Sequence, residues 1–268
     1  IWIVPQFGWQ VMFYLAVIPL LLLPLIWTQL PDSVAFLVRQ GKTAEARKVL
    51  GALTGKPLPD DAELAAHQPQ KTEQSLAALF SNNRALSTLM FFQAFFMCLL
   101  MVYGLGSWLP KLMTMAGYGF GSSLMFLLFL NIGGIIGAIG GGWLSDRFHP
   151  RPVLMLFFTL AAVSLALLGF KSHVAVLYFL VTVAGATTIG SQILLYAYVA
   201  QFYPTAIRST ALGWSSGVGR IGAILGPVLG GALLAMQLSH QMNFLAFVVP
   251  GALAVIAIML TAGRKEAV

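Results

Sequence analysis

The chain has 268 residues, of which 59% are hydrophobic and 9% are charged, and its mean hydropathy is +0.86. Soluble domains carry about 25% charged residues, so these values exclude an ordinary water-facing surface. Most of the basic residues behind the net charge of +7 lie between apolar runs, which is typical of membrane orientation and not of a nucleic-acid partner. The single cysteine, Cys98, lies inside an apolar run. We therefore expect no disulfide framework and no zinc or redox site.

Seven apolar stretches are long enough, at roughly 20 residues each, to cross a bilayer as helices. Backbone groups inside lipid must satisfy their own hydrogen bonds, and the continuous apolar runs do not alternate as the strands of a membrane barrel do. The sequence therefore predicts an all-α integral membrane protein with seven transmembrane helices. They cover residues 9–30, 86–109, 122–143, 153–170, 174–202, 210–236 and 243–262.

The segment between the first two spans, residues 31–84, is the only stretch of soluble character. Its first part predicts two short helices broken at Gly41, and its later part, from Lys56 to His67, predicts a flexible tether. The chain starts at Ile1 without an initiator Met or a charged leader, so we expect it to be a piece of a longer protein. One span in residues 1–30, a long loop in 31–84 and six spans in 85–268 fit the last helix of a first bundle followed by a complete C-terminal bundle.

The distribution of Lys and Arg predicts the orientation, because cytoplasmic loops are enriched in them. Twelve fall on one side of the predicted membrane, and only Lys111 and Lys171 fall on the other. The long loop and the C-terminus are therefore expected in the cytoplasm. The twelve are Arg39, Lys42, Arg47, Lys48, Lys56, Lys71, Arg84, Arg147, Arg151, Arg208, Arg264 and Lys265.

A charged motif, Gly142-Trp-Leu-Ser-Asp146-Arg147, follows the third predicted span. Glycine permits a tight turn, and Asp146 is suited to accept from a helix N-terminus, where free N–H groups favour an anion. The sixth span begins on the same side, and Arg208 next to it is a candidate ion-pair partner for Asp146. The simpler interpretation is that these charges are hydrated loop residues.

The motif resembles a loop signature of the major facilitator superfamily, in which it closes the cytoplasmic gate. His149-Pro150-Arg151 departs from that signature, whereas Gly142, Asp146 and Arg147 match it. Residues 202–231 are similar to the aromatic acid:proton symporter branch of the superfamily, as are the segments 103–111 and 185–192. Within that branch the chain is most similar to the benzoate permeases and then to the 4-hydroxybenzoate permeases. The resemblance implies a proton-coupled carrier of a small aromatic carboxylate in a bacterial inner membrane.

Arg220 is the one basic residue outside the loops. It lies ten positions beyond Thr210, about 15 Å into the sixth span. A central Arg costs about 2.5–3.5 kcal/mol on insertion scales, so it is expected to face the bundle interior and an anionic partner. Every acidic residue of the chain lies outside the predicted spans. The partner is thus either a substrate carboxylate, held by the guanidinium fork, or a group in the missing N-terminal half.

Other polar residues within the spans are candidates for the same substrate cavity. Thr188, Gln192 and Tyr196 share one face of the fifth span at four-residue spacing, and Gln93 and Asn131 are isolated polar groups in the second and third spans. Each alone is better explained by a hydrogen bond to a neighbouring helix, and together, facing Arg220, they become candidates for the site. Glycines at four-residue spacing indicate close helix packing, and Trp108 is expected to anchor the chain at the outer interface.

The sequence offers no phosphate-binding loop, no metal-ligand cluster and no nucleophile with its base. We therefore expect a secondary transporter and not an enzyme, with no cofactor and with the proton as coupling ion. Because no acidic residue lies in a span, the proton-binding acid is expected in the missing half. The alternatives are a carrier of another organic acid or a sugar, or a seven-helix receptor.

Overall fold

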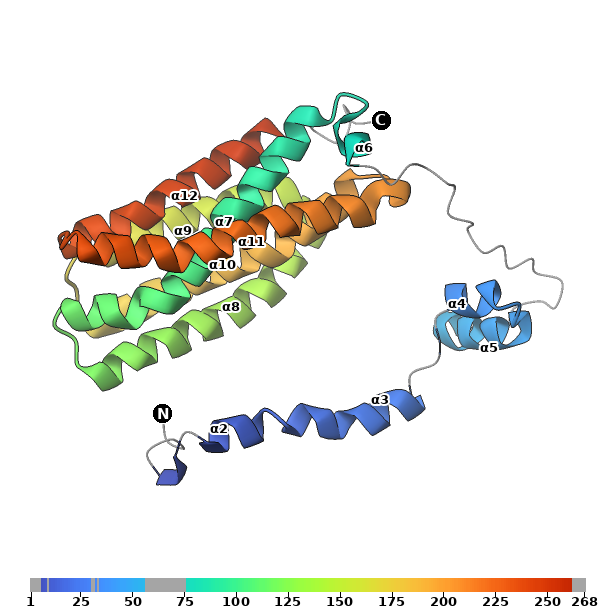
Figure 1. Cartoon of the computed structure of the whole chain (residues 1–268), viewed down its shortest axis with the longest axis horizontal. Helices are drawn as coiled ribbons and strands as arrows, with labels where there is room; N and C mark the ends of the chain where they lie inside the picture. Colours follow the sequence, from blue (N-terminus) through green and yellow to red (C-terminus); the bar gives the residue numbers. More distant parts are fainter. Residues whose placement is uncertain (1–5, 9, 30–31, 33, 56–75, 262–268) are drawn as a thin grey trace. The chain divides into compact units, whose positions relative to one another are not determined.

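The computed structural model describes residues 6–8, 10–29, 32, 34–55 and 76–261, and the described residues contain helices and no strands (Figure 1). Contacts divide the chain into two compact units, Ile1–Lys71 and Thr72–Val268. Each unit is described by itself below.

The first predicted span is helical but interrupted. It consists of α2 (Gln10–Leu15), a 3-10 helix (Ile18–Leu22) and α3 (Leu23–Gln29), so this predicted span is helical in three pieces. Pro19 and Pro24 lack the N–H that would bond the preceding turn. The backbone responds with tighter bonds over three residues, among them 2.9 Å from Leu20 N to Val17 O.

Two short helices follow, α4 (Val34–Arg39) and α5 (Thr43–Thr54). Gly41 between them has a φ of +77°, and Gly55 after α5 has a φ of +66°, a region that glycine enters without steric cost. The predicted helix pair broken at Gly41 is confirmed. The predicted tether from Lys56 to His67 lies outside the described residues.

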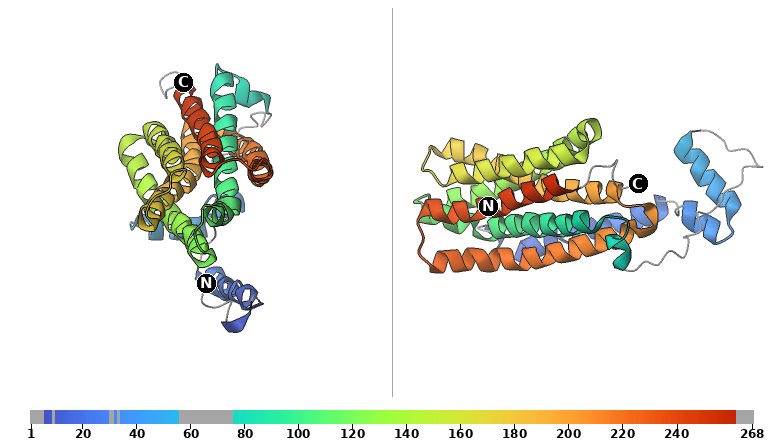
Figure 2. Two further views of the ribbon diagram at one scale, coloured as in Figure 1. Left: turned by 90° about the vertical axis from the view of Figure 1, so that its left-hand side faces the viewer. Right: turned by 90° about the horizontal axis from the view of Figure 1, so that it is seen from above.

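Six long helices form the second unit, and their order along the chain can be followed in Figures 1 and 2. A short helix, α6 (Ala77–Phe80), precedes them and packs against α7 and α11. All six are long and apolar enough to cross a membrane, which confirms the last six predicted spans. They are α7 (Ala85–Met115), α8 (Phe120–Phe148), α9 (Pro150–Leu168), α10 (Val174–Phe202), α11 (Thr205–Ala235) and α12 (His240–Leu260).

Large apolar side chains cover the outside of this bundle as well as its core. Phe91, Phe95 and Phe158 are fully buried, whereas Ile139 and Ile224 are 72% and 68% exposed. Apolar residues on both sides of long helices are typical of a bundle surrounded by lipid. The chain is therefore a multi-pass membrane protein.

Glycines bring two helix pairs into backbone contact. A Cβ on Gly222 or Gly226 of α11 would overlap the backbone of α7, and one on Gly133 or Gly137 of α8 would overlap the backbone of α10. The close packing predicted from glycine spacing is confirmed at these positions. At Gly213 and Gly217 an added Cβ would meet nothing within 4 Å among the described residues, so close packing there stays a prediction.

Candidate functional site

Arg220 lies at the centre of α11, with fifteen residues of the helix on either side. This places its Cα about 22 Å from each helix end. The side chain is exposed on the unit, and Nη1 donates a hydrogen bond of 3.0 Å to the hydroxyl oxygen of Tyr103 on α7. Tyr103 is itself 39% exposed. The two helices thus present a guanidinium and a phenol side by side at mid-helix depth.

The described residues supply Arg220 with no carboxylate. Asp146 is the only described acidic residue of the second unit. It lies in the last turn of α8, at the end of a helix, whereas Arg220 lies at the middle of one. Lys42 and Glu45 form an ion pair of 4.0 Å, but both lie in the first unit. The described residues of the second unit therefore hold no carboxylate at the mid-helix position of Arg220.

A short chain of contacts links Tyr196, one of the predicted site residues, to this pair. Its ring packs edge-on against Phe95 of α7, with ring centroids 5.0 Å apart. Phe95 in turn borders Gly219, the neighbour of Arg220, where an added Cβ would lie 3.2 Å from the Phe95 Cβ. Gln192, one turn before Tyr196 on α10, is half-buried.

The other three predicted residues form hydrogen bonds with carbonyl oxygens of their own helix or of α12. Thr188 is buried and donates to Ala184 O of its own helix at 2.7 Å, and Asn131 is exposed and donates to Leu127 O at 2.7 Å. Gln93 turns toward α12, with 3.5 Å from Nε2 to Leu253 O. None of these bonds links them to Arg220, so the structure does not join them with it.

The motif predicted as a loop is helical. Gly142, Asp146 and Arg147 all lie in α8, which continues to Phe148, and His149 alone separates α8 from α9. An added Cβ on Gly142 would meet nothing within 4 Å, so no neighbour among the described residues requires a glycine here. The sharp reversal occurs instead at His149, whose φ is +72°.

The predicted Asp146–Arg208 ion pair is absent from the described residues. Asp146 is exposed, and Arg208 is half-buried with its Nε lacking a hydrogen-bond partner. The physical reason is the packing order. α8 packs chiefly against α10 and α11 chiefly against α7, so the two helix ends belong to different pairs. Arg147 lies over the ring of Trp143, 5.8 Å from its centroid.

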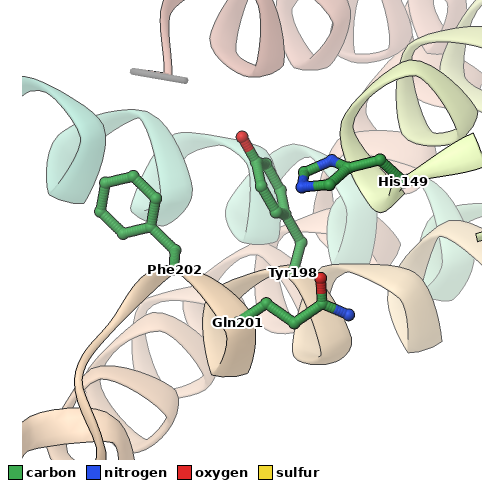
Figure 3. A pocket seen from close by; sticks show the side chains of 4 residues that line it. All are labelled: His149, Tyr198, Gln201 and Phe202. Carbon is green, nitrogen blue, oxygen red and sulfur yellow. The ribbon is translucent and has the colours of Figure 1, made fainter. Parts of the chain in front are cut away.

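The end of the bundle beside His149 contains a small cleft that the sequence did not predict. Figure 3 shows His149, Tyr198, Gln201 and Phe202 around it. Tyr198 Oη lies 2.9 Å from Thr261 Oγ1, and Arg151 Nη2 donates to Met259 O at 2.7 Å. These bonds tie the ends of α9 and α10 to the end of α12. The cleft, of about 10 Å³, holds at most one water molecule.

Chemically, the Arg220–Tyr103 pair is suited to bind an anion. A guanidinium only donates hydrogen bonds, and a carboxylate only accepts them. Charge-assisted bonds of this kind are about twice as strong as neutral ones. Tyr103 was not predicted as a site residue, because its role depends on which helix lies beside Arg220.

Six long apolar helices, with a guanidinium halfway along one of them, define the class, a multi-pass membrane protein. The family model of the Major Facilitator Superfamily matches residues 132–267, and that of the sugar (and other) transporters matches residues 3–107. The chain belongs to the major facilitator superfamily, so the seven-helix receptor alternative is wrong.

Several named relatives are transporters of aromatic acids. The benzoate transport protein of Acinetobacter baylyi is 44% identical over 266 residues, which is 98% of this chain and 57% of that protein. The gentisate transporter of Corynebacterium glutamicum is 37% identical, covering 90% of this chain and 49% of the relative. The 4-hydroxybenzoate transporter of Pseudomonas aeruginosa is 35% identical, covering 96% and 59%. The family and these relatives are transporters, which confirms that the chain is not an enzyme.

The chain spans between about half and three-fifths of the length of these relatives, as the shares of 49% to 59% show. Among solved structures, the fucose:proton symporter FucP of E. coli matches with a TM-score of 0.60 and 18% identity, over 82% of this chain and 53% of that one. At this identity the match shows the fold alone, and it confirms a partial major facilitator fold.

Proposed function

We propose that this chain is the C-terminal part of a proton-coupled secondary transporter that imports an aromatic carboxylate, with benzoate favoured and 4-hydroxybenzoate next. The observation that carries the proposal is the guanidinium of Arg220, held at the centre of α11 without an acidic partner among the described residues. A charge at that depth is costly. A substrate carboxylate that binds it offsets part of this cost during each transport cycle.

The relatives support the class of substrate. Benzoate, gentisate and 4-hydroxybenzoate, named for three of them, all join a carboxylate to an aromatic ring. Arg220 matches the carboxylate that they share, and Tyr103 and Tyr196 supply aromatic faces against which a ring can stack. The relative with the highest of these identities favours benzoate.

The proposal requires a second bundle. In carriers of this kind the substrate binds near the membrane midplane between two halves, and these rock to expose it alternately. The exposed side chain of Arg220 agrees with a site that the N-terminal half completes. We place the loop of residues 31–84 and the C-terminus in the cytoplasm of a bacterial inner membrane, on the charge distribution given above.

The energetics of anion import support coupling to a cation, for which we propose the proton. Importing a monovalent anion against a negative-inside potential costs about 2.3 kcal/mol per 100 mV. Co-transport of two or more protons reverses the net charge moved and makes uptake favourable. No described residue of the six spans is a carboxylic acid apart from Asp146 at a helix end, so we assign the proton-binding acid to the N-terminal half.

Uptake of labelled benzoate into cells that carry the intact transporter tests this function. We expect an imposed inward proton gradient to stimulate uptake, a protonophore to abolish it, and unlabelled 4-hydroxybenzoate to compete less strongly than benzoate. Competition by a sugar or by an aliphatic acid, with none by benzoate, would overturn the proposal in favour of the other carriers.

A further inference from the structure

We propose that Tyr103 is a second substrate-binding residue, whose hydroxyl donates a hydrogen bond to the same carboxylate that Arg220 binds. This inference rests on the proposed function, and it assigns a specific partner to the site. It starts from the direction of the hydrogen bond between the two side chains, 3.0 Å from Arg220 Nη1 to Tyr103 Oη.

The direction of that bond leaves the phenol proton free. A guanidinium carries five N–H donors and no acceptor, so the oxygen of Tyr103 must accept. The one O–H proton of Tyr103 therefore points to another group, and the described residues provide no acceptor for it. A tyrosine hydroxyl within an apolar bundle usually finds a partner. A substrate carboxylate beside Arg220 supplies one.

The side chains of Tyr103 and Arg220 are both exposed, so a substrate can reach them. Tyr103 is 39% exposed, and Arg220 is also exposed on the same unit. By contrast, Met101, Gly104 and Leu105, within two residues of Tyr103 on α7, are buried. The phenol and guanidinium thus reach outward from a packed surface to a place that a ligand can enter.

The packing of α7 on α11 fixes the pair in register. Gly219 borders Phe95 and Leu99, and Gly226 lies against the backbone at Leu100 and Gly104. These contacts occur on both sides of Arg220 along α11. Because the two backbones touch there, the packing of the helices holds the Cα atoms of Tyr103 and Arg220 at a fixed distance. Such preorganised donors lose little freedom when a ligand binds.

The arrangement also selects the head group. One N–H of Arg220 and the O–H of Tyr103 offer two donors to one ligand, and a carboxylate accepts both. An amide has one neutral acceptor oxygen and an N–H₂ group that cannot accept, so it takes the two donors less well than the two oxygens of a charged carboxylate. The Tyr103 hydroxyl is therefore a determinant of preference for benzoate over benzamide, a neutral compound of the same shape.

The substitution Tyr103→Phe in the intact transporter tests the proposal, because it removes only the hydroxyl. We expect the KM for benzoate to rise about tenfold, the value of one lost charge-assisted hydrogen bond, with a maximal rate within about twofold of the unsubstituted protein. Inhibition by benzamide should change much less. Tyr118→Phe is the matched control, because it deletes a hydroxyl that bonds Ser172 O at 3.1 Å in the turn region outside the spans.

Rates are normalised to the amount of transporter in the membrane, and protection of the purified protein by benzoate against thermal unfolding gives a second measure of affinity. An unchanged KM and unchanged protection in Tyr103→Phe would overturn the role of Tyr103. The proposed function stays intact in that case if Arg220→Lys reduces uptake at least about tenfold. Absence of benzoate uptake by the unsubstituted transporter would instead overturn the proposed function.

Discussion

Trp108 of α7 donates a hydrogen bond of 2.7 Å from its indole Nε1 to the carbonyl oxygen of Pro227 in α11. The indole also covers Gly230, where an added Cβ would overlap the ring. The sequence indicated an interfacial anchor at Trp108, whereas the structure shows a half-buried residue that joins the two helices of the candidate site.

Trp108→Phe should therefore destabilise the bundle. It removes the bond to Pro227 O and part of the ring that covers Gly230, and we expect the free energy of unfolding to fall by about 1–3 kcal/mol. Unfolding in mixed micelles, followed by circular dichroism, measures the change. Trp143→Phe is the control, because Trp143 is 60% exposed and its replacement should have little effect. Equal losses in the two variants would argue against a special role for Trp108.

Gly222→Ala should be among the most damaging small substitutions in α11. The added methyl would overlap the carbonyl oxygen of Phe96, so α7 and α11 must separate, at a cost of about 1–3 kcal/mol. Gly217→Ala in the same helix meets nothing within 4 Å, and the higher helix propensity of Ala should leave stability unchanged or slightly raised. Thermal unfolding of the two variants compares them directly, and similar melting temperatures would contradict the close approach.

Arg151→Ala should free the end of α12. Arg151 Nη2 bonds Met259 O in the last turn of that helix at 2.7 Å, and the side chain is half-buried. We expect a loss of about 1 kcal/mol and faster amide hydrogen exchange confined to the last turns of α12. Arg147→Ala removes an exposed arginine of the same region and serves as the control. Unchanged exchange in α12 would show that the bond contributes nothing to its order.

Asp146→Asn should separate function from stability. A carboxylate in the last turn of α8 is unfavourable with the helix dipole, and no described residue pairs with it. Removing the charge should leave the bundle as stable or slightly more stable. If Asp146 closes the cytoplasmic gate against the N-terminal half, the same change should lower the turnover of uptake more than it changes the KM. An unchanged turnover would favour a hydrated surface charge.

Helix content and the position of Arg220 were predictable because both depend on local sequence. Long apolar runs must become helices in lipid, and an arginine ten residues into such a run has a fixed depth. The break in the first span was less predictable. Pro19 and Pro24 were visible, but whether a proline kinks a helix or starts a 3-10 turn depends on how nearby carbonyls are satisfied.

The composition of the site was only partly predictable, because it depends on which helices cross. Thr188, Gln192 and Tyr196 share a face by periodicity, yet Thr188 is fully satisfied within α10 and Tyr196 packs on Phe95. Tyr103 entered the site through the contact of α7 with α11, which glycines such as Gly222 set. The prediction of an Asp146–Arg208 ion pair was wrong for the same reason. Two helix ends on the same side of the membrane need not belong to neighbouring helices.

The central claim is that the guanidinium of Arg220 binds the carboxylate of the substrate. Its most direct test is uptake of labelled benzoate by the intact transporter carrying Arg220→Lys, which keeps the charge but loses the planar fork. With Lys171→Arg, at an exposed residue between α9 and α10, as control and membrane levels matched, we predict that Arg220→Lys reduces uptake at least about tenfold. Uptake by Arg220→Lys within about twofold of the unsubstituted transporter would contradict the account.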